Sequence, residues 1–136
     1  MPIDYRVDHQ KHLVVARGLG VVTGEDIFGY QREVWSEADV NGYNELVDMR
    51  EVRRIHVPTP ERMRELALVS SKSDSSSRPS KFAIVAPQEL VFKLGKIYES
   101  YRNLDARSTK EVGVFRSMKE ALAYLGLDDI SESHSS

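Results

Sequence analysis

Apolar and polar residues alternate along the first part of the chain with the period of two that is typical of β-strands. Residues 3–8 (IDYRVD) alternate in this way, and a second stretch at 12–17 (HLVVAR) follows after the short link HQK. A link of this length joins antiparallel strands, so we expect a β-hairpin. Short strands are also expected at 44–49 and 111–115, and the apolar run at 82–86 (FAIVA) is typical of a central strand buried on both faces.

Apolar residues at helical spacing predict two helices in the first half of the chain. Thr23 suits the N-cap of the first helix, because its hydroxyl can accept from a free backbone N–H, and we expect this helix to end near Asp39. The second helix begins with Thr59 as N-cap and Pro60 at the first helical position, where the missing N–H costs nothing. The expected buried faces are Ile27, Tyr30, Val34, Trp35 and Ala38, and then Met63, Leu66, Ala67 and Ser70.

Two more helices are expected in the second half. The third begins at Pro87. Ser117 and Glu120 have the spacing of a full capping box at the start of the fourth, and Gly126 is expected to end it. The expected buried faces are Leu90, Leu94, Ile97, Tyr98 and Tyr101, and then Ala121, Leu122 and Leu125.

Three segments have no such period. Residues 50–58 (REVRRIHVP) are expected to be extended or irregular. Residues 70–80 include seven serines, which predicts a mobile surface loop. Residues 128–136 are polar and are expected to form a disordered tail.

The order of these elements predicts an α/β fold. A strand alternates with a helix after the initial hairpin, so we expect a single-layer, mostly parallel sheet of about five strands, with an antiparallel N-terminal hairpin at its edge and four helices. A chain of 136 residues with 40% apolar and 29% charged residues suits one globular domain, which we place at residues 1–127.

The composition excludes several classes of protein. There is no cysteine, which rules out a disulfide framework, a thiolate metal site and a cysteine nucleophile. The first residues contain no apolar signal region, and no apolar run approaches the roughly 20 residues of a membrane span, so we expect a cytoplasmic protein without integral membrane association. The net charge of −2 argues against a dedicated nucleic-acid binder.

Motifs for metal, phosphate or catalytic chemistry are incomplete. His9 and His12 have a spacing that suits a metal, but no third ligand can be placed near them, so exposed turn histidines are the better interpretation. Gly18 and Gly20 lack the third glycine of the dinucleotide fingerprint, with Thr23 in its place, and are interpreted as turn formers.

A catalytic serine or acid–base pair is also not indicated. The sequence has no Gly-x-Ser-x-Gly elbow. Asp48 lies within a strand, where it is either buried with a partner or placed at the end of the sheet, and nothing pairs with it for acid–base chemistry. We therefore expect no catalytic residues, no metal and no cofactor, and an enzyme is the third of three hypotheses.

Basic residues gather in one segment. Residues 50–81 carry eight basic and four acidic side chains, a charge of +4, whereas the rest of the chain carries −6. This segment leaves the third strand and reaches a helix N-terminus, where ligands of open α/β sheets often bind and where an anion is favoured. A solvated basic loop is the alternative. The candidate partner- or ligand-binding residues are Arg50, Arg53, Arg54, His56, Thr59 and Arg62.

Several stretches resemble the SpoIIAA-like group of the STAS superfamily, whose fold is related to that of CRAL-TRIO lipid-transfer domains. The similarity covers residues 3–127. It lies in the helix start TGED at 23–26, the strand ELVD at 45–48, the strand KFAIVA at 81–86 and the stretch EVGVFR at 111–116, followed by EAL at 120–122.

The resemblance implies a regulatory module that binds partners. Such proteins carry a phosphorylatable serine in the turn after the central strand, and this turn falls at residues 56–59 (HVPT), where only Thr59 could accept a phosphate. We therefore expect a non-enzymatic protein-interaction module without the usual phospho-serine switch. The alternative is a small-molecule or lipid-headgroup binding domain with an apolar pocket under the 70–80 loop. Expected partners are a protein or a small anionic ligand, and a homodimer is compatible with the domain size.

Overall fold

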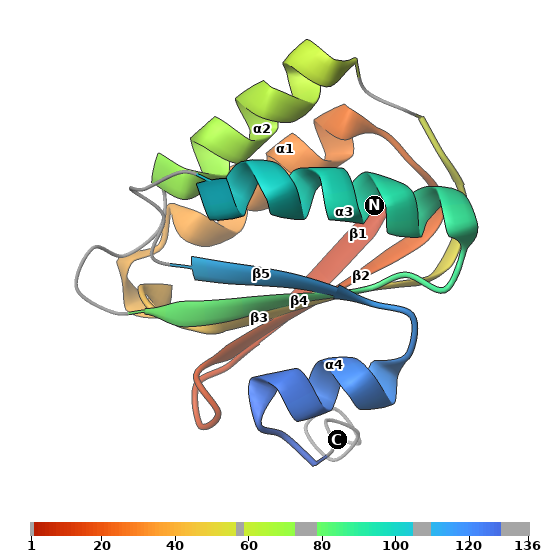
Figure 1. Cartoon of the computed structure of the whole chain (residues 1–136). Helices are drawn as coiled ribbons and strands as arrows, with labels where there is room; N and C mark the ends of the chain where they lie inside the picture. The colour runs from red at the N-terminus through yellow and green to blue at the C-terminus, as the bar shows by residue number, and fades with distance from the viewer. Residues whose placement is uncertain (1, 57–58, 73–78, 105–109, 129–136) are drawn as a thin grey trace.

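A five-stranded β-sheet forms the centre of the molecule, and its strands lie side by side in chain order (Figure 1). The computed structural model describes residues 2–56, 59–72, 79–104 and 110–128. The first two strands are antiparallel and all other neighbours are parallel, which confirms the predicted sheet. The strands are β1 Ile3–Asp8, β2 Leu13–Val22, β3 Asn44–Ile55, β4 Ser80–Val85 and β5 Lys110–Phe115.

The helices cover the two faces of the sheet unequally. Helices α1 (Gly24–Trp35), α2 (Pro60–Lys72) and α3 (Glu89–Leu104) lie on one face, and α4 (Met118–Leu125) lies on the other (Figure 1). Each of the first three connects two parallel neighbouring strands, and α2 packs mainly against α3. A short 3₁₀ helix, Ala38–Val40, precedes β3.

The capping residues start and stop the helices largely as predicted. Thr23 forms a reciprocal capping box with Asp26, and Thr59 Oγ accepts from the Arg62 amide at 3.1 Å. Ser117 caps α4, and Gly126 ends it with φ of 75°. The full capping box predicted at Ser117 is wrong in one respect, because the Glu120 carboxylate accepts from the Ser117 hydroxyl and not from its backbone N–H.

Three predicted boundaries are wrong by a few residues. Helix α1 ends at Trp35, where the Ser36 hydroxyl donates to a carbonyl of the last turn. Helix α3 begins at Glu89 and not at Pro87. Helix α2 continues to Lys72 and β4 begins at Ser80, which shortens the predicted 70–80 loop; its residues 73–78 lie outside the described part of the chain, as do tail residues 129–136.

The buried face of α3 agrees only in part with the one expected. Leu94 and Tyr98 are buried as predicted, but Leu90 and Ile97 are 50% and 46% exposed and Val91 is buried instead. The stripe with Leu90 and Ile97 and the stripe with Val91 are both apolar, so the helical period alone does not show which one is buried. Gly95 favours the stripe with Val91: a Cβ at Gly95 would lie 3.0 Å from Val114, so the missing side chain lets this face of α3 approach β5.

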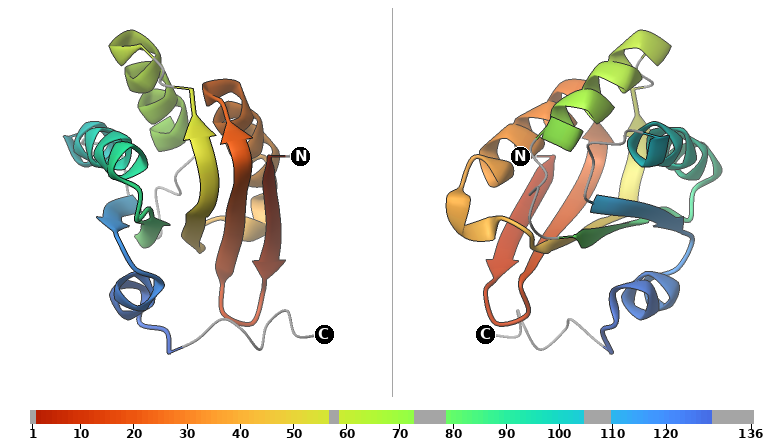
Figure 2. Two further views of the ribbon diagram at one scale, coloured as in Figure 1. Left: turned by 90° about the vertical axis from the view of Figure 1, so that its right-hand side faces the viewer. Right: turned by 60° about the vertical axis from the view of Figure 1, so that its left-hand side comes forward.

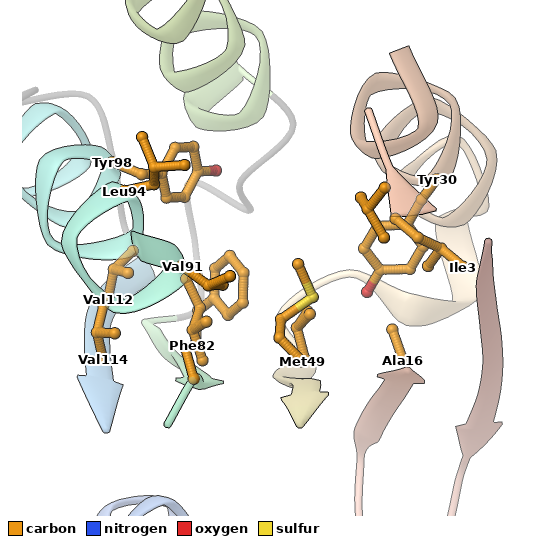
Figure 3. Close-up of a cluster of buried hydrophobic side chains, with 14 of the residues drawn as sticks. Ile3, Ala16, Tyr30, Met49, Phe82, Val91, Leu94, Tyr98, Val112 and Val114 are labelled. Carbon is orange, nitrogen blue, oxygen red and sulfur yellow. The ribbon is translucent and has the colours of Figure 1, made fainter. Parts of the chain in front are cut away.

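The core is mainly apolar, and its larger half lies between the sheet and α1, α2 and α3 (Figure 3). At the beginning of β3, buried polar side chains that contact one another interrupt the apolar core. Glu45 is 1% exposed, accepts from the Tyr30 hydroxyl at 2.7 Å and lies 3.5 Å from the ammonium of Lys110. Lys110 is 5% exposed, and its Nζ lies 3.5 Å from the centre of the Trp35 ring. This pairing compensates two buried charges that would otherwise be costly.

Candidate functional site

Strand β3 is much longer than its neighbour β4. The pairing of β3 with β4 stops at Asp48 and Val85, but β3 continues to Ile55 beside the second half of β2 (Figure 2). We call residues 49–55 the β3 extension. The sequence-based expectation of a strand ending at residue 49, followed by an extended or irregular segment, therefore missed that the strand continues to Ile55 and stays paired with β2.

Two irregularities in the pairing of β2 with β3 explain why the alternation of a strand is absent from the β3 extension. The register shifts between Arg17 and Leu19 and again between Gly20 and Val21, each time with one extra residue in β3. Such β-bulges turn two consecutive side chains to the same face. The buried residues of the β3 extension are consequently three apart, and the pairs Arg50–Glu51 and Arg53–Arg54 are exposed between Met49, Val52 and Ile55.

Gly18 and Gly20 belong to this bulged region and not to a turn, so their predicted role as turn formers is wrong. Both lie within β2. A Cβ on Gly18 would come within 2.8 Å of the side chains of Met49 and Val52, which pack over it. Gly20 has φ of +65° at a register shift, a conformation that favours glycine.

Asp48 and Arg50 form a bidentate ion pair within β3. Arg50 Nε and Nη2 donate to the two carboxylate oxygens at 3.0 and 2.9 Å, and its backbone amide donates to the same carboxylate. These hydrogen bonds raise the pKa of Arg50. Of the two placements expected for Asp48, the structure shows the buried one with a partner. Arg50 is thus already bound to a carboxylate of its own chain.

Arg62 is also engaged within the chain. Its guanidinium lies 2.6 Å from Glu25 and 3.4 Å from Glu65, and it stacks over the Phe28 ring at 4.1 Å. The hydrogen bond from Arg62 to Glu25 raises the pKa of Arg62. Arg62 therefore joins the beginnings of α1 and α2, and Thr59 is used as the N-cap of α2.

The other three candidate residues are placed differently. Arg53, Arg54 and His56 are exposed, and no hydrogen bond or ion pair of their side chains is present within the described ranges. Arg54 pairs with Val21, which is 49% exposed on the same face. Arg53 also lines a surface hollow of about 360 Å³, together with Leu19, Gly20, Arg50, Glu51 and Val52. The structure thus divides the six candidates into Arg50, Thr59 and Arg62, whose side chains bond to other groups of the chain, and three exposed residues with no side-chain partner among the described residues.

Gln88 is a residue that the sequence-based reasoning missed. Its side-chain amide donates to the carbonyls of Met49 and Val52 at 2.9 and 2.7 Å, and lies 3.3 Å from that of Arg50. These contacts connect the start of α3 to the β3 extension. A glutamine after a proline carries no sequence signal for this role.

An apolar cavity of about 90 Å³ lies between the sheet and the three helices of one face. Figure 3 shows Tyr30, Met49, Val91 and Leu94 around this region. Burial and the neighbouring Glu45 carboxylate raise the pKa of the Tyr30 hydroxyl well above its ordinary value. Met63 of α2 also lines the cavity, but none of the described lining residues belongs to 70–80, so the pocket expected under that loop stays a prediction.

A larger, polar cleft of about 880 Å³ lies at the end of the sheet where β3, β4 and β5 begin, opposite the end that carries the β3 extension. Lys81, Arg102 and Lys110 line it. Their charges have structural roles close to the ends of α3 and α4: Lys81 Nζ lies 3.3 Å from the carbonyl of Tyr124, and Arg102 donates to the Tyr98 hydroxyl. Positive charge is favoured at helix C-termini, which gives these cations a role in the fold. The size of the cleft alone therefore does not indicate a ligand site.

His9 and His12 flank Tyr43 at the β1–β2 turn. His9 Nδ1 lies 2.8 Å from the Tyr43 hydroxyl, and both rings contact the tyrosine ring. No group of histidine, aspartate or glutamate side chains suited to a metal is found in the part of the chain that the structure describes. Among the same residues, no helix is long and apolar enough to cross a membrane.

Comparison with known proteins rests on structure alone. No protein-family model matches the chain, and no curated protein matches it. Among solved structures, it is similar to an uncharacterized protein of the DUF3478 family with a SpoIIAA-like fold from Shewanella loihica PV-4. The two share 17% identity with a TM-score of 0.57, over 90% of this chain and 93% of that one. The fold is SpoIIAA-like. The resemblance expected from the sequence is confirmed at the level of the fold.

Proposed function

We propose that this protein is a STAS-type binding module that recognises an acidic protein partner or a small anionic ligand at the end of the β3 extension. It acts without catalysis and without the usual phospho-serine switch. The observation that supports this function best is the exposure of Arg53, Arg54 and His56 without a side-chain partner among the described residues, with Arg53 at the 360 Å³ hollow. Guanidinium groups that are not already paired can bind carboxylates and phosphates in bidentate fashion.

The remaining candidates support this function indirectly. Arg50 is held by Asp48 and Arg62 by Glu25, so both keep the segment in place and contribute less charge to a partner. Thr59 caps α2 by accepting from the Arg62 amide, so its side-chain oxygen has a structural role.

Nuclear magnetic resonance titration tests the proposal with two probes, a short glutamate-rich peptide and inorganic phosphate. We expect the amide signals of Arg53, Arg54 and His56 to shift with at least one probe. The double variant Arg53→Ala/Arg54→Ala should bind about tenfold more weakly, since two partly exposed charge contacts contribute roughly 1–2 kcal/mol together. Response to the peptide alone indicates a protein partner, whereas response to phosphate indicates a small anion.

The matched control is Arg32→Ala/Lys119→Ala, which removes the same charge from exposed sites on α1 and α4. It should leave the affinity unchanged. An equal loss in this control, or signals that shift only elsewhere in the molecule, would refute recognition at the β3 extension.

A second function is supported by the apolar cavity. Its lining is almost entirely hydrophobic, and cavities of this kind exclude water and accept apolar molecules. A volume of about 90 Å³ suits a short alkyl segment of a small molecule or lipid. Native mass spectrometry of the purified protein should then show a bound apolar molecule that Ile27→Trp removes and the exposed control Val21→Trp retains. A wild-type protein without any such adduct would exclude this function.

A further inference from the structure

Among the residues that the structure describes, the β3 extension has a neighbouring strand on one side only. Beyond Asp48 it pairs with β2, while β4 has already ended at Val85. Backbone carbonyls on an unpaired edge need another donor or solvent. Gln88 Nε2 supplies the donor, at 2.9 Å from Met49 O and 2.7 Å from Val52 O.

The orientation of the Gln88 amide follows from its partners. Only the NH₂ group can donate, so Nε2 faces the carbonyls of β3, and Oε1 is left buried without a hydrogen-bond partner. The backbone carbonyl of Gln88 accepts from Phe92 N at 2.9 Å in the first turn of α3. The side chain is therefore attached at one end to the start of a helix and at the other to the edge of β3.

The contact to Val52 lies next to the residues that would meet a partner. The second register shift follows immediately, and the exposed pair Arg53–Arg54 comes directly after Val52. Backbone pairing beyond this point rests on β2 alone, through Val21 with Arg54 and Val22 with Ile55. The Val52 carbonyl that Gln88 contacts thus lies directly before the bulge and the two exposed arginines.

We propose that Gln88 is the positioning residue of the candidate site: its amide replaces the missing strand neighbour and orients Arg53 and Arg54 toward an anionic partner. This inference rests on the proposed function at the β3 extension. It means that a residue immediately before α3 holds the conformation of a surface that belongs to β3. It also explains why the side chain keeps one buried acceptor unpaired, because both of its N–H groups are directed to the edge of β3.

Hydrogen exchange tests the first part of this inference. Gln88→Met keeps the length of the side chain and removes both donors, and Gln88→Glu places a carboxylate against the carbonyls. Amide exchange in residues 49–55 should become at least about tenfold faster in Gln88→Met, and faster still in Gln88→Glu, since repulsion is added to the lost bonds. The control Gln10→Met, at an exposed position of the β1–β2 turn, should exchange like the wild type.

The affinity for the glutamate-rich peptide tests the second part. Gln88→Met should weaken binding about threefold to tenfold, while the rest of the sheet keeps its exchange protection. Unchanged exchange in residues 49–55 would refute the role of Gln88 even if Arg53 and Arg54 bind the peptide. Faster exchange with unchanged affinity would refute its role in positioning. A wild-type protein whose binding is insensitive to Arg53→Ala/Arg54→Ala would instead refute the proposed function, which separates the two failures.

Discussion

The two halves of β3 use charge in opposite ways. In the first half, residues 44–48, the strand pairs on both sides, and Glu45 is buried against Tyr30 and Lys110. In the β3 extension the strand pairs on one side only, and Arg53 and Arg54 are exposed without partners among the described residues. Charge is neutralised where β3 is enclosed by the sheet and remains available at Arg53 and Arg54, near the end of the β3 extension.

This difference has a physical origin. A buried charge without a partner costs several kcal/mol, so each charge in the first half has a partner. An exposed charge costs little, and its contribution to folding is small. Changes in the first half should therefore alter stability, and changes at the end of the β3 extension should alter binding.

Loss of the buried carboxylate should have the largest effect. Glu45→Ala removes the carboxylate that lies 3.5 Å from the buried Lys110 ammonium and that accepts from the Tyr30 hydroxyl, and we expect a loss of about 3–5 kcal/mol in the free energy of unfolding. Urea denaturation followed by Trp35 fluorescence measures this loss. A decrease below about 1 kcal/mol would mean that the two halves do not differ as described.

Filling the space above Gly18 tests how the β3 extension is packed. Gly18→Val should cost about 1–3 kcal/mol, because a side chain there meets Met49 and Val52. Gly29→Ala is the matched control: nothing lies within 4 Å of the added Cβ in α1, and helix propensity predicts a gain of about 0.5–1 kcal/mol. Thermal denaturation compares the two, and a Gly18→Val protein as stable as wild type would contradict the observed pairing.

Alkaline pH should distinguish the buried tyrosine from exposed ones. The pKa of Tyr30 is raised by burial and by Glu45, so its stabilising contribution is complete below the unfolded pKa of about 10 and is lost as pH rises toward the folded pKa. Above pH 10 the wild type should lose about 1.4 kcal/mol per pH unit more than Tyr30→Phe. Denaturation curves at several alkaline pH values measure this difference, and equal slopes would contradict the burial of Tyr30 beside Glu45.

Much of the fold could be predicted because local signals agreed with it. Thr23, Thr59 and Ser117 marked helix starts by their capping chemistry, and the alternation at residues 3–8 and the apolar run at 82–86 marked strands. Helix α3 shows the limit of such patterns. Two apolar stripes were present, and the choice between them depended on the approach of Gly95 to Val114.

The sequence indicated the charged segment of the candidate site but not which of its side chains are paired within the chain. Local charge density pointed to the β3 extension, whereas the separation of Arg53 and Arg54 from Arg50 and Arg62 depends on tertiary partners. The bulges were hidden because they replace the period of two with a period of three. An apolar spacing of three between exposed arginine-containing pairs is the signal that could have indicated them.

The most direct test of the account measures stability and binding in the same variant. Arg53→Ala/Arg54→Ala should keep its free energy of unfolding within about 0.5 kcal/mol of wild type, as exposed substitutions usually do, while its affinity for the glutamate-rich peptide falls about tenfold. A loss of stability without a loss of affinity would contradict the assignment of this end of β3 to binding.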